Sequence, residues 1–297
     1  DNLSTGAMKN VHSNVVTFIG NIEDEGELEK AIESFRPDYV VHKAAQVSVQ
    51  NSISDISNDA MINIIGTVNI IKFAHKYAVK KIIFASSAAV YGNAHVMPIA
   101  ISHPAQPLSP YGASKKTAEE YLILAKKLFN LDYVILRYSN VYGPRQTASG
   151  EGGVISIFTN HVINNEQPVI YGDGLQTRDF IYVEDVASAN LQALRFAGSG
   201  VFNISSTTST SINQLYAIIQ SISQCNLSPI HKPAKSGDIK ESLLCNKRSI
   251  QKLGWHPELS IAEGLTKTYE YYLKQNQPSL TTVNALPTKL KTTTLPL

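Results

Sequence analysis

The sequence predicts a doubly wound α/β fold, in which helices cover both faces of a parallel sheet. Two observations lead to this prediction. Apolar runs of strand length alternate with segments of helical spacing through the first half of the chain, and these runs are rich in Val and Ile without a polar residue at every second position. Strands of that composition are buried on both faces, as in a parallel sheet. Ligands of such folds bind at the carboxyl ends of the strands.

The predicted elements follow a regular order through the first 142 residues. The expected strands and helices are strands over 15–19, 38–44, 81–87 and 132–141, and helices over 23–35, 55–77 and 109–129. Polar residues stand at several of the strand ends, including Ser87 and Asn140. Together these segments predict a first domain over residues 1–142, to which a segment near 179–204 returns.

The elements become shorter after Gly143-Pro-Arg145. Helical spacing recurs over 154–164, 212–223 and 262–274, which predicts a smaller α/β lobe over residues 143–275. Residues 276–297 are rich in Thr and Pro and lack periodicity, so we expect a disordered tail.

Composition excludes several classes of function. The net charge of +2 and the pI of about 8.4 are too mild to indicate binding to nucleic acid or to an anionic membrane. The two cysteines, Cys225 and Cys245, have no CxxC or His-rich neighbourhood, so no metal site is expected and a reducing cytoplasm is favoured. No apolar run approaches the ~18 residues of a transmembrane helix.

Ser87, Tyr111 and Lys115 form the constellation that points to chemistry. Tyr111 and Lys115 stand four residues apart in a helical segment, so both lie on one helical face. A nearby ammonium favours the phenolate and is expected to lower the pKa of Tyr111, which makes this residue a general base. Ser87 ends an apolar strand and would offer a hydroxyl to the substrate oxygen.

The spacing alone is weak evidence, because a chain with 14 tyrosines produces such matches by chance. The chain contains Tyr-x-x-x-Lys three times, at Tyr39/Lys43, Tyr77/Lys81 and Tyr111/Lys115. The first pair lies in a strand-like run that would separate its two side chains, and the second straddles a helix end. Only the third pair lies inside a helix and follows a strand that ends in paired serines, so context selects Tyr111 and Lys115.

The order of further motifs resembles the extended short-chain dehydrogenase/reductase family, and within it the NAD-dependent nucleotide-sugar epimerases, most of all the UDP-glucose 4-epimerases. The resemblance runs from Asp1 to about Lys274. The segments that carry it are Asp1-Asn-Leu-Ser-Thr-Gly6, His42-Lys-Ala-Ala-Gln46, Asn63-Ile-Ile-Gly-Thr67, Ser86-Ser-Ala-Ala-Val-Tyr-Gly92, Tyr111-Gly-Ala-Ser-Lys115, Leu136-Arg-Tyr-Ser-Asn-Val-Tyr-Gly-Pro-Arg-Gln146, Tyr171-Gly-Asp-Gly-Leu-Gln-Thr-Arg-Asp-Phe180 and Gly237-Asp-Ile239.

This resemblance implies an enzyme that binds NAD in the domain over 1–142 and interconverts C4 epimers of a UDP-hexose (UDP-glucose and UDP-galactose, or their N-acetyl forms) through a transient 4-keto intermediate. A cytoplasmic homodimer is also implied. The implied NAD contacts are Asp1, Asn2, Asn21, Ile22, Ala44, Ala45, Asn63, Tyr111, Lys115 and Tyr138. The implied substrate contacts are Ser87, Asn140, Tyr171, Arg178, Lys235, Asp238 and Ser242.

Simpler structural roles stay open for several of these residues. Arg178 suits a pyrophosphate because its planar fork matches phosphate oxygens, but it could instead pair with its neighbour Asp179. Asp1 would bind the adenosine ribose and favour NAD over NADP, or it is an ordinary surface acid. Asn140 and Asp238 could be turn residues, and Tyr171 a core residue.

Departures from the family pattern narrow the expected activity. Dehydratases and decarboxylases of the superfamily carry acids where this chain has Ala88 and Ala89, and a methyl group cannot transfer a proton, which disfavours dehydration. Lys235 replaces an Arg and loses its bidentate geometry. Lys43 replaces an apolar residue, and the small Ser242 leaves room for an N-acetyl group.

The glycine-rich loop that cradles the NAD pyrophosphate in this family is absent from the sequence, as is the strand-helix-strand unit that contains it. We therefore expect an N-terminally truncated chain that binds NAD poorly. Two alternatives stay open: an epimerase of another nucleotide sugar, such as UDP-glucuronate or an ADP-heptose, and a non-catalytic nucleotide-sugar-binding protein.

Overall fold

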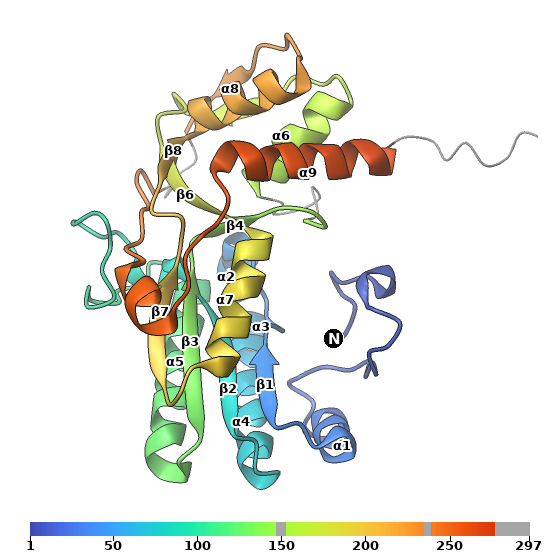
Figure 1. Ribbon diagram of the computed structural model, residues 1–297, viewed down its shortest axis with the longest axis vertical. Coiled ribbons are helices and arrows are strands. Elements are labelled where there is room, and N and C mark those ends of the chain that lie inside the picture. Colours follow the sequence, from blue (N-terminus) through green and yellow to red (C-terminus); the bar gives the residue numbers. More distant parts are fainter. Residues whose placement is uncertain (147–152, 235–238, 277–297) are drawn as a thin grey trace, which may run out of the picture.

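The computed structural model describes residues 1–146, 153–234 and 239–276. Figure 1 shows two tiers, a lower one built on a parallel sheet and an upper one of short strands and helices. The lower sheet has the strand order β1-β2-β3-β7, and all of its pairs are parallel. Its strands are β1 (Tyr39–His42), β2 (Lys81–Ser87), β3 (Asp132–Tyr138) and β7 (Gly200–Ile204).

Helices pack on both faces of this sheet, as the apolar runs predicted. Ile82 and Phe84 of β2 pack in one apolar cluster with residues of α4 (Gly66–Lys76) and α5 (Pro110–Phe129). Ile83, between them, packs in a second cluster with residues of α7 (Val183–Arg195). Because neighbouring residues of a strand face opposite sides, this division confirms the doubly wound α/β fold.

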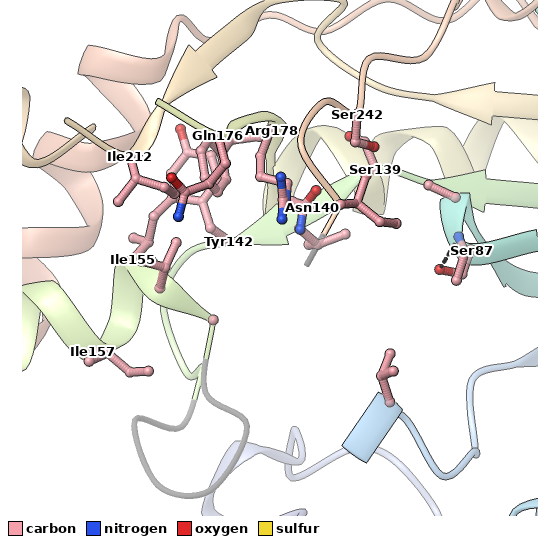
Figure 2. Close-up of a pocket in the computed structure, with 18 of the residues that line it drawn as sticks. Ser87, Ser139, Asn140, Tyr142, Ile155, Ile157, Gln176, Arg178, Ile212 and Ser242 are labelled. Carbon is pink, nitrogen blue, oxygen red and sulfur yellow. Dashed lines mark hydrogen bonds between the residues drawn. The ribbon is translucent and has the colours of Figure 1, made fainter. Parts of the chain in front are cut away.

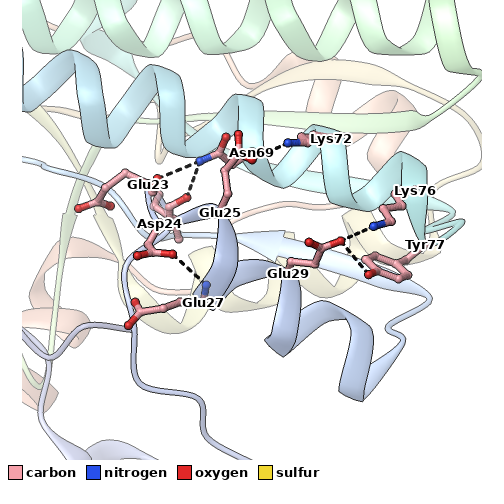
Figure 3. A network of polar contacts seen from close by, with 10 residues as sticks. Glu23, Asp24, Glu25, Glu27, Glu29, Asn69, Lys72, Lys76 and Tyr77 are labelled. Atoms are coloured by element: carbon pink, nitrogen blue, oxygen red, sulfur yellow. Dashed lines mark hydrogen bonds and ion pairs between the residues drawn. The ribbon is translucent and has the colours of Figure 1, made fainter.

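The first helix, α1 (Glu25–Phe35), is held against α4 by polar contacts (Figure 3). Asn69 donates to the carbonyls of Ile22 and Glu23, both at 3.2 Å, and Lys72 and Lys76 pair with acids of α1. These ion pairs are largely exposed, so they position α1 more than they stabilise it.

The strand predicted over 15–19 is not formed, and this prediction was wrong. A strand needs a neighbour for its ladder hydrogen bonds, and in the part of the chain that the structure describes β1 pairs only with β2. The apolar side chains of the segment are exposed, with Val16 at 66 % and Ile19 at 56 %.

Two other predicted elements are divided in the structure. The helix expected over 55–77 consists of α3 (Ile56–Ala60), a π-helix η2 (Met61–Ile65) and α4, and α2 (Val49–Ser54) precedes it. Asp55 begins the predicted helix, because its carboxylate accepts from Asn58 N at 2.9 Å and caps α3. The interruption inside the predicted range is η2, where the hydrogen bonds of a π-helix replace those of the α-helix. The strand expected over 132–141 breaks at Ser139, where the chain leaves the lower sheet and enters β4 (Asn140–Tyr142).

The upper tier has its own apolar core. Its three-stranded sheet contains β4, β6 (Thr177–Tyr182) and β8 (Ser209–Ser211), and a two-stranded sheet pairs β5 (Val169–Tyr171) with β9 (Ile230–Lys232). Three helices surround this core, namely α6 (Val154–Ile163), α8 (Ile212–Ser223) and α9 (Ile261–Asn276). All three lie within a residue or two of the ranges predicted from helical spacing. The predicted tail, apart from Asn276 at the end of α9, lies outside the described residues.

One buried carboxylate joins the two tiers. Asp179 on β6 is 0 % exposed and accepts hydrogen bonds from Ser206 N at 2.9 Å, Ser206 Oγ at 2.8 Å and Leu244 N at 3.2 Å. Ser139 Oγ donates to the same carboxylate at 3.4 Å. Its donors therefore come from three separate crossings of the chain between the tiers.

A buried ion pair fixes α5 on the lower sheet. Glu119 is 3 % exposed and accepts from Arg137 Nε at 2.9 Å and Nη2 at 2.6 Å, and Ser86 Oγ also donates to it. One carboxylate thus ties a helix to two adjacent strands. No helix among the described residues is both long and apolar enough to cross a membrane.

Glu119→Gln is expected to destabilise the protein by about 3 kcal/mol in urea unfolding, because it leaves the Arg137 charge buried without a counter-charge. The next residue supplies a matched control. Glu120 forms an exposed pair with Lys116 at 3.4 Å, so Glu120→Gln should change stability by less than about 0.5 kcal/mol. Equal effects of the two substitutions would contradict this role for Glu119.

Candidate active site

A cavity of about 820 Å³ lies between the tiers and is lined from both. Ser87, Ala88, Ala89 and Tyr111 contribute from the lower tier. The upper-tier residues Asn140, Tyr171, Arg178 and Ser242 line the same space. Figure 2 shows Arg178 and Asn140 directed into it, with Ser87 on a separate part of the wall. The volume suits a ligand larger than a monosaccharide.

Ser87 and Tyr111 meet because a strand end faces a helix start. Ser87 is the last residue of β2, and its Oγ accepts from Ala89 N at 3.1 Å. Ser109 caps α5 by accepting from Gly112 N at 3.1 Å, and Pro110 occupies the first turn, which places Tyr111 at the start of the helix. The Ser87 hydroxyl and the Tyr111 phenol line the same cavity, and Ser87 lowers the pKa of Tyr111.

Gly112 allows α5 to pack closely against the loop that follows Ser87. A Cβ at position 112 would lie 2.6 Å from the carbonyl oxygen of Ala89, closer than van der Waals contact allows. Any other residue would therefore push α5 away from the loop that follows Ser87. The glycine of the Tyr-Gly-Ala-Ser-Lys segment thus has a packing reason.

Lys115 is buried beside Tyr111. Its Nζ lies 5.9 Å from the centre of the Tyr111 ring and 5.0 Å from that of Phe84, and the residue is 3 % exposed. Burial lowers the pKa of Lys115 to about 8, against the opposing effects of Asp59 and Glu119. Lys115 is therefore still protonated at neutral pH.

The pKa of Tyr111 departs from the direction that the sequence predicted. Burial raises this pKa, the Ser87 hydroxyl lowers it, and the charge of Asp59 raises it again. The spacing of Tyr111 and Lys115 showed their proximity but not how strongly the surrounding protein desolvates the phenol. Desolvation disfavours the charged form and outweighs the help from Ser87.

The residues predicted to bind NAD lie in two groups. Asp1, Asn2, Asn21 and Ile22 come together in the N-terminal segment, where Asn2 Nδ2 donates to Asn21 Oδ1 at 2.8 Å and Gly20 N donates to the Asp1 carbonyl at 3.2 Å. The second group surrounds the carboxyl ends of the lower strands and consists of Ala44, Ala45, Asn63, Tyr111, Lys115 and Tyr138.

The second group fits a nicotinamide dinucleotide. Ala44 and Ala45 follow β1 with little side-chain bulk, and the Lys115 ammonium carries donors that ribose hydroxyls accept. Asn63 has a supporting place: its amide accepts from Gln46 N at 2.9 Å and donates to the Gln46 carbonyl at 3.0 Å. It thereby holds the loop that contains both alanines.

Several polar residues near the site were not singled out from the sequence. Asp59 and Glu119 act on the charge of Lys115, and Glu119 is its neighbour at i+4, a spacing that could have revealed it. Lys43, noticed only as a departure from the family, donates to the Tyr138 hydroxyl. Desolvation and the Lys115 charge lower the pKa of Lys43 to about 7.

Some of the residues predicted to bind the substrate lie within the described ranges and others lie outside them. Asn140, Tyr171, Arg178 and Ser242 line the cavity, whereas Lys235 and Asp238 lie outside the described residues. The Asp179 carboxylate is occupied by Ser206, Leu244 and Ser139, while Arg178 Nη1 donates to the Thr177 carbonyl at 2.8 Å. Within the described ranges, no group of three or more His, Cys, Asp or Glu side chains could hold a metal ion.

Fold and site together define an NAD-dependent enzyme of the short-chain dehydrogenase/reductase type. The model of the NAD dependent epimerase/dehydratase family matches residues 1–205. The chain belongs to this family, and its cofactor is NAD. The family predicted from the motifs is therefore confirmed.

Solved structures of 4-epimerases are similar to this chain over most of their length. The UDP-glucose 4-epimerase of Thermotoga maritima with UDP-glucose has a TM-score of 0.91 and 41 % identity, over 93 % of this chain and 90 % of that one. The UDP-N-acetylglucosamine 4-epimerase of Methanobrevibacter ruminantium, in complex with UDP-N-acetylmuramic acid, has a TM-score of 0.88 and 36 % identity, over 93 % and 89 %. The Thermus thermophilus UDP-glucose 4-epimerase with NAD has a TM-score of 0.86 and 32 % identity, over 94 % and 90 %.

His42, beneath the site, sets a pH dependence of stability. Thr67 Oγ donates to the Asn63 carbonyl at 2.7 Å, so His42 Nε2 donates to Thr67 Oγ at 3.0 Å. Nδ1 is buried, with no hydrogen-bond partner among the described residues. Burial, with the charges of Lys115 and Lys43, lowers the pKa of His42 to about 3.

Stability is expected to fall on acidification below about pH 6.5. Unfolded imidazole takes up a proton near pH 6.5 while folded His42 stays neutral to about pH 3, so unfolding binds a proton in this window. The free energy of unfolding contributed by His42 then falls by up to about 1.4 kcal/mol per pH unit. In urea titrations at several pH values, His42→Leu should make the free energy of unfolding less dependent on pH. Thr67→Val keeps the His42 imidazole, so it should leave this pH dependence in place.

Proposed function

We propose that the protein interconverts C4 epimers of a UDP-hexose, UDP-glucose and UDP-galactose or their N-acetyl forms, through a transient 4-keto intermediate. One observation carries this proposal. Ser87 and Tyr111, which suit proton transfer at a hydroxyl, line the same cavity as Arg178, which suits a phosphate. The similarity to UDP-sugar 4-epimerases supports the same conclusion.

The chain supplies the proton chemistry of this reaction. Tyr111 removes the proton of the sugar 4-hydroxyl and returns it after the sugar presents its other face. Ser87 holds the C4 oxygen beside the phenol, and the Lys115 cation favours the phenolate. NAD, when bound, supplies reversible acceptance of hydride from C4, so no net redox change occurs. Its positive charge would also favour the phenolate of Tyr111 against the effect of burial.

The wall of the cavity disfavours competing reactions. Ala88 and Ala89 line it next to Ser87, and neither side chain can protonate a leaving hydroxyl or abstract a proton beside a ketone. Arg178 and Asn140 are proposed to hold the pyrophosphate, and Tyr171 to lie beside the uracil. Ser242 leaves room for an N-acetyl group because its side chain is small.

We further propose that residues 1–142, with the returning segment near 179–204, bind NAD, and that residues 143–275 mainly bind the nucleotide sugar. Cytoplasmic location fits Cys225 and Cys245, both of which are free thiols.

A homodimer fits the outer face of α5 and η2. Apolar side chains gather there with large exposed fractions: Tyr121 43 %, Leu124 45 % and Leu128 63 % on α5, and Met61 50 % and Ile65 43 % on η2. The two elements pack side by side, so their side chains form one surface. A second copy of the chain is the proposed partner.

Tyr111→Phe should lower turnover of UDP-glucose by at least about 100-fold, because the general base is lost, while UDP still binds. Chromatography of the sugar products and calorimetry with UDP measure the two effects. Tyr77→Phe is the matched control, since Tyr77 stands in a chance copy of the same spacing and should leave turnover unchanged. Near-normal turnover by Tyr111→Phe would disprove the proposed mechanism.

The sugar can be identified with a panel of UDP-glucose, UDP-N-acetylglucosamine and UDP-glucuronate. Conversion of either of the first two at C4 is expected. Conversion of UDP-glucuronate alone would show that the protein is a uronate epimerase. Binding of UDP-sugars without conversion of any would indicate a binding protein.

Leu124→Glu is expected to convert the dimer to a monomer in light scattering, because a carboxylate would be buried in an apolar interface. Leu191→Glu is the control: Leu191 is 55 % exposed on α7, which packs on the opposite face of the lower sheet from α5, and its replacement should leave the dimer intact. A monomeric wild-type chain would contradict the proposed assembly.

A further inference from the structure

Asp59 is a buried acid that the proposed mechanism does not use. It lies on α3 and is 1 % exposed. Its Oδ1 accepts hydrogen bonds from Gln46 Nε2 at 2.8 Å and Asn63 Nδ2 at 3.0 Å. Both donors are neutral amides. A buried carboxylate is costly unless a positive charge lies near enough to offset its desolvation.

The network that begins at Asp59 reaches the start of α5. Asn63 Nδ2 also donates to Ser114 Oγ at 3.1 Å, and Ser114 Oγ donates to the Tyr111 carbonyl at 3.0 Å. Ser114 is the residue before Lys115, and both are buried. The carboxylate is thereby connected through two side chains to the helical turn that holds Tyr111 and Lys115.

The charge of Asp59 acts on the same turn. Among the groups that oppose the effect of burial on Lys115, Asp59 is the largest and Glu119 the second. The same charge also opposes ionisation of Tyr111. Geometry and charge therefore both connect Asp59 with the two residues of the proposed catalytic pair.

Of the titratable groups near Lys115, Asp59 is the acid that is not paired with another cation in the described hydrogen bonds and ion pairs. The titratable groups that interact electrostatically with Lys115 are Asp59 on α3, His42 and Lys43 at the end of β1, and Glu119 on α5. The ring of Tyr111 lies 5.9 Å from its Nζ. Glu119 is committed to the Arg137 guanidinium. His42 is neutral, and Lys43 repels a second cation. Asp59 is the acid in this set whose described hydrogen bonds involve no cation.

We propose that Asp59 is a positioning residue for the catalytic pair. Its buried negative charge keeps the Lys115 ammonium protonated in a site that excludes water, and its hydrogen bond to Asn63 fixes that amide against the first turn of α5. The catalytic part of this inference rests on the proposed function of Tyr111 and Lys115.

Asp59→Asn separates charge from shape. Both described hydrogen bonds end on one oxygen, so an amide oxygen in the same place can accept them, and only the charge is removed. Without that charge Lys115 loses its proton at lower pH, and Tyr111 ionises more readily. Both limbs of the kcat profile should move to lower pH. Above the alkaline limb, a shift of half to one pH unit lowers kcat roughly 3- to 10-fold.

The control is Asp55→Asn, one helical turn earlier. Asp55 caps α3 by accepting from Asn58 N at 2.9 Å, and asparagine caps equally well, so the pH profile should match that of the wild type. A purely structural role for Asp59 would lower kcat by the same factor at every pH. A profile that does not move along the pH axis would overturn the proposal.

A second measurement does not depend on activity. In urea unfolding, a double-mutant cycle of Asp59→Asn and Lys115→Met should show that the double variant is more stable than the two single effects predict, because each single variant leaves one buried charge uncompensated. If Asp59→Asn alone did not fold, the double variant should fold. Additive effects, or failure of both variants to fold, would overturn the proposal. An inactive wild-type chain with a positive cycle would instead refute only the proposed function.

Discussion

The buried pair of Glu119 and Arg137 is the interaction on which the geometry of the site depends. Glu119 accepts from Arg137 on β3 and from Ser86 on β2, while it belongs to α5. It therefore fixes one helix against two strands in a single arrangement. Ser86 precedes Ser87 on β2, and Glu119 lies one helical turn after Lys115 on α5. The contacts of Glu119 therefore position the Ser87 hydroxyl relative to the Lys115 ammonium. Burial makes this arrangement specific, since breaking such a pair leaves a charge without water.

The proposed site brings several charges into one poorly hydrated region. Lys115 and Lys43 repel each other, while Asp59 and Glu119 support Lys115. Desolvation favours the neutral forms of both lysines and of the Tyr111 phenol. The balance of these opposing effects, more than the presence of any one residue, determines whether a proton moves at neutral pH.

The sequence was sufficient for the fold class, for α5 and for the Ser87–Tyr111–Lys115 constellation, because each rests on local periodicity or short spacing. The predictions from the sequence were wrong where residues far apart in the chain determine the local structure or the pKa. Val15–Ile19 has strand composition, but no strand among the described residues pairs with it, and the helix expected over 55–77 is interrupted by the π-helix η2. The pKa direction of Tyr111 depends on burial by residues far along the chain, and no local pattern of the sequence indicates that the charge of Asp59 acts on Lys115.

Asp179 joins the crossings of the chain at Ser139, Ser206 and near Leu244 with one carboxylate. A hinge needs a crossing where backbone angles can change independently of the others. Here three of the crossings share a single acceptor, so rotation of the upper tier about one of these three would strain the hydrogen bonds of the other two. Asp179 therefore couples these three crossings, so that a relative movement of the two tiers would have to break hydrogen bonds at more than one of them together.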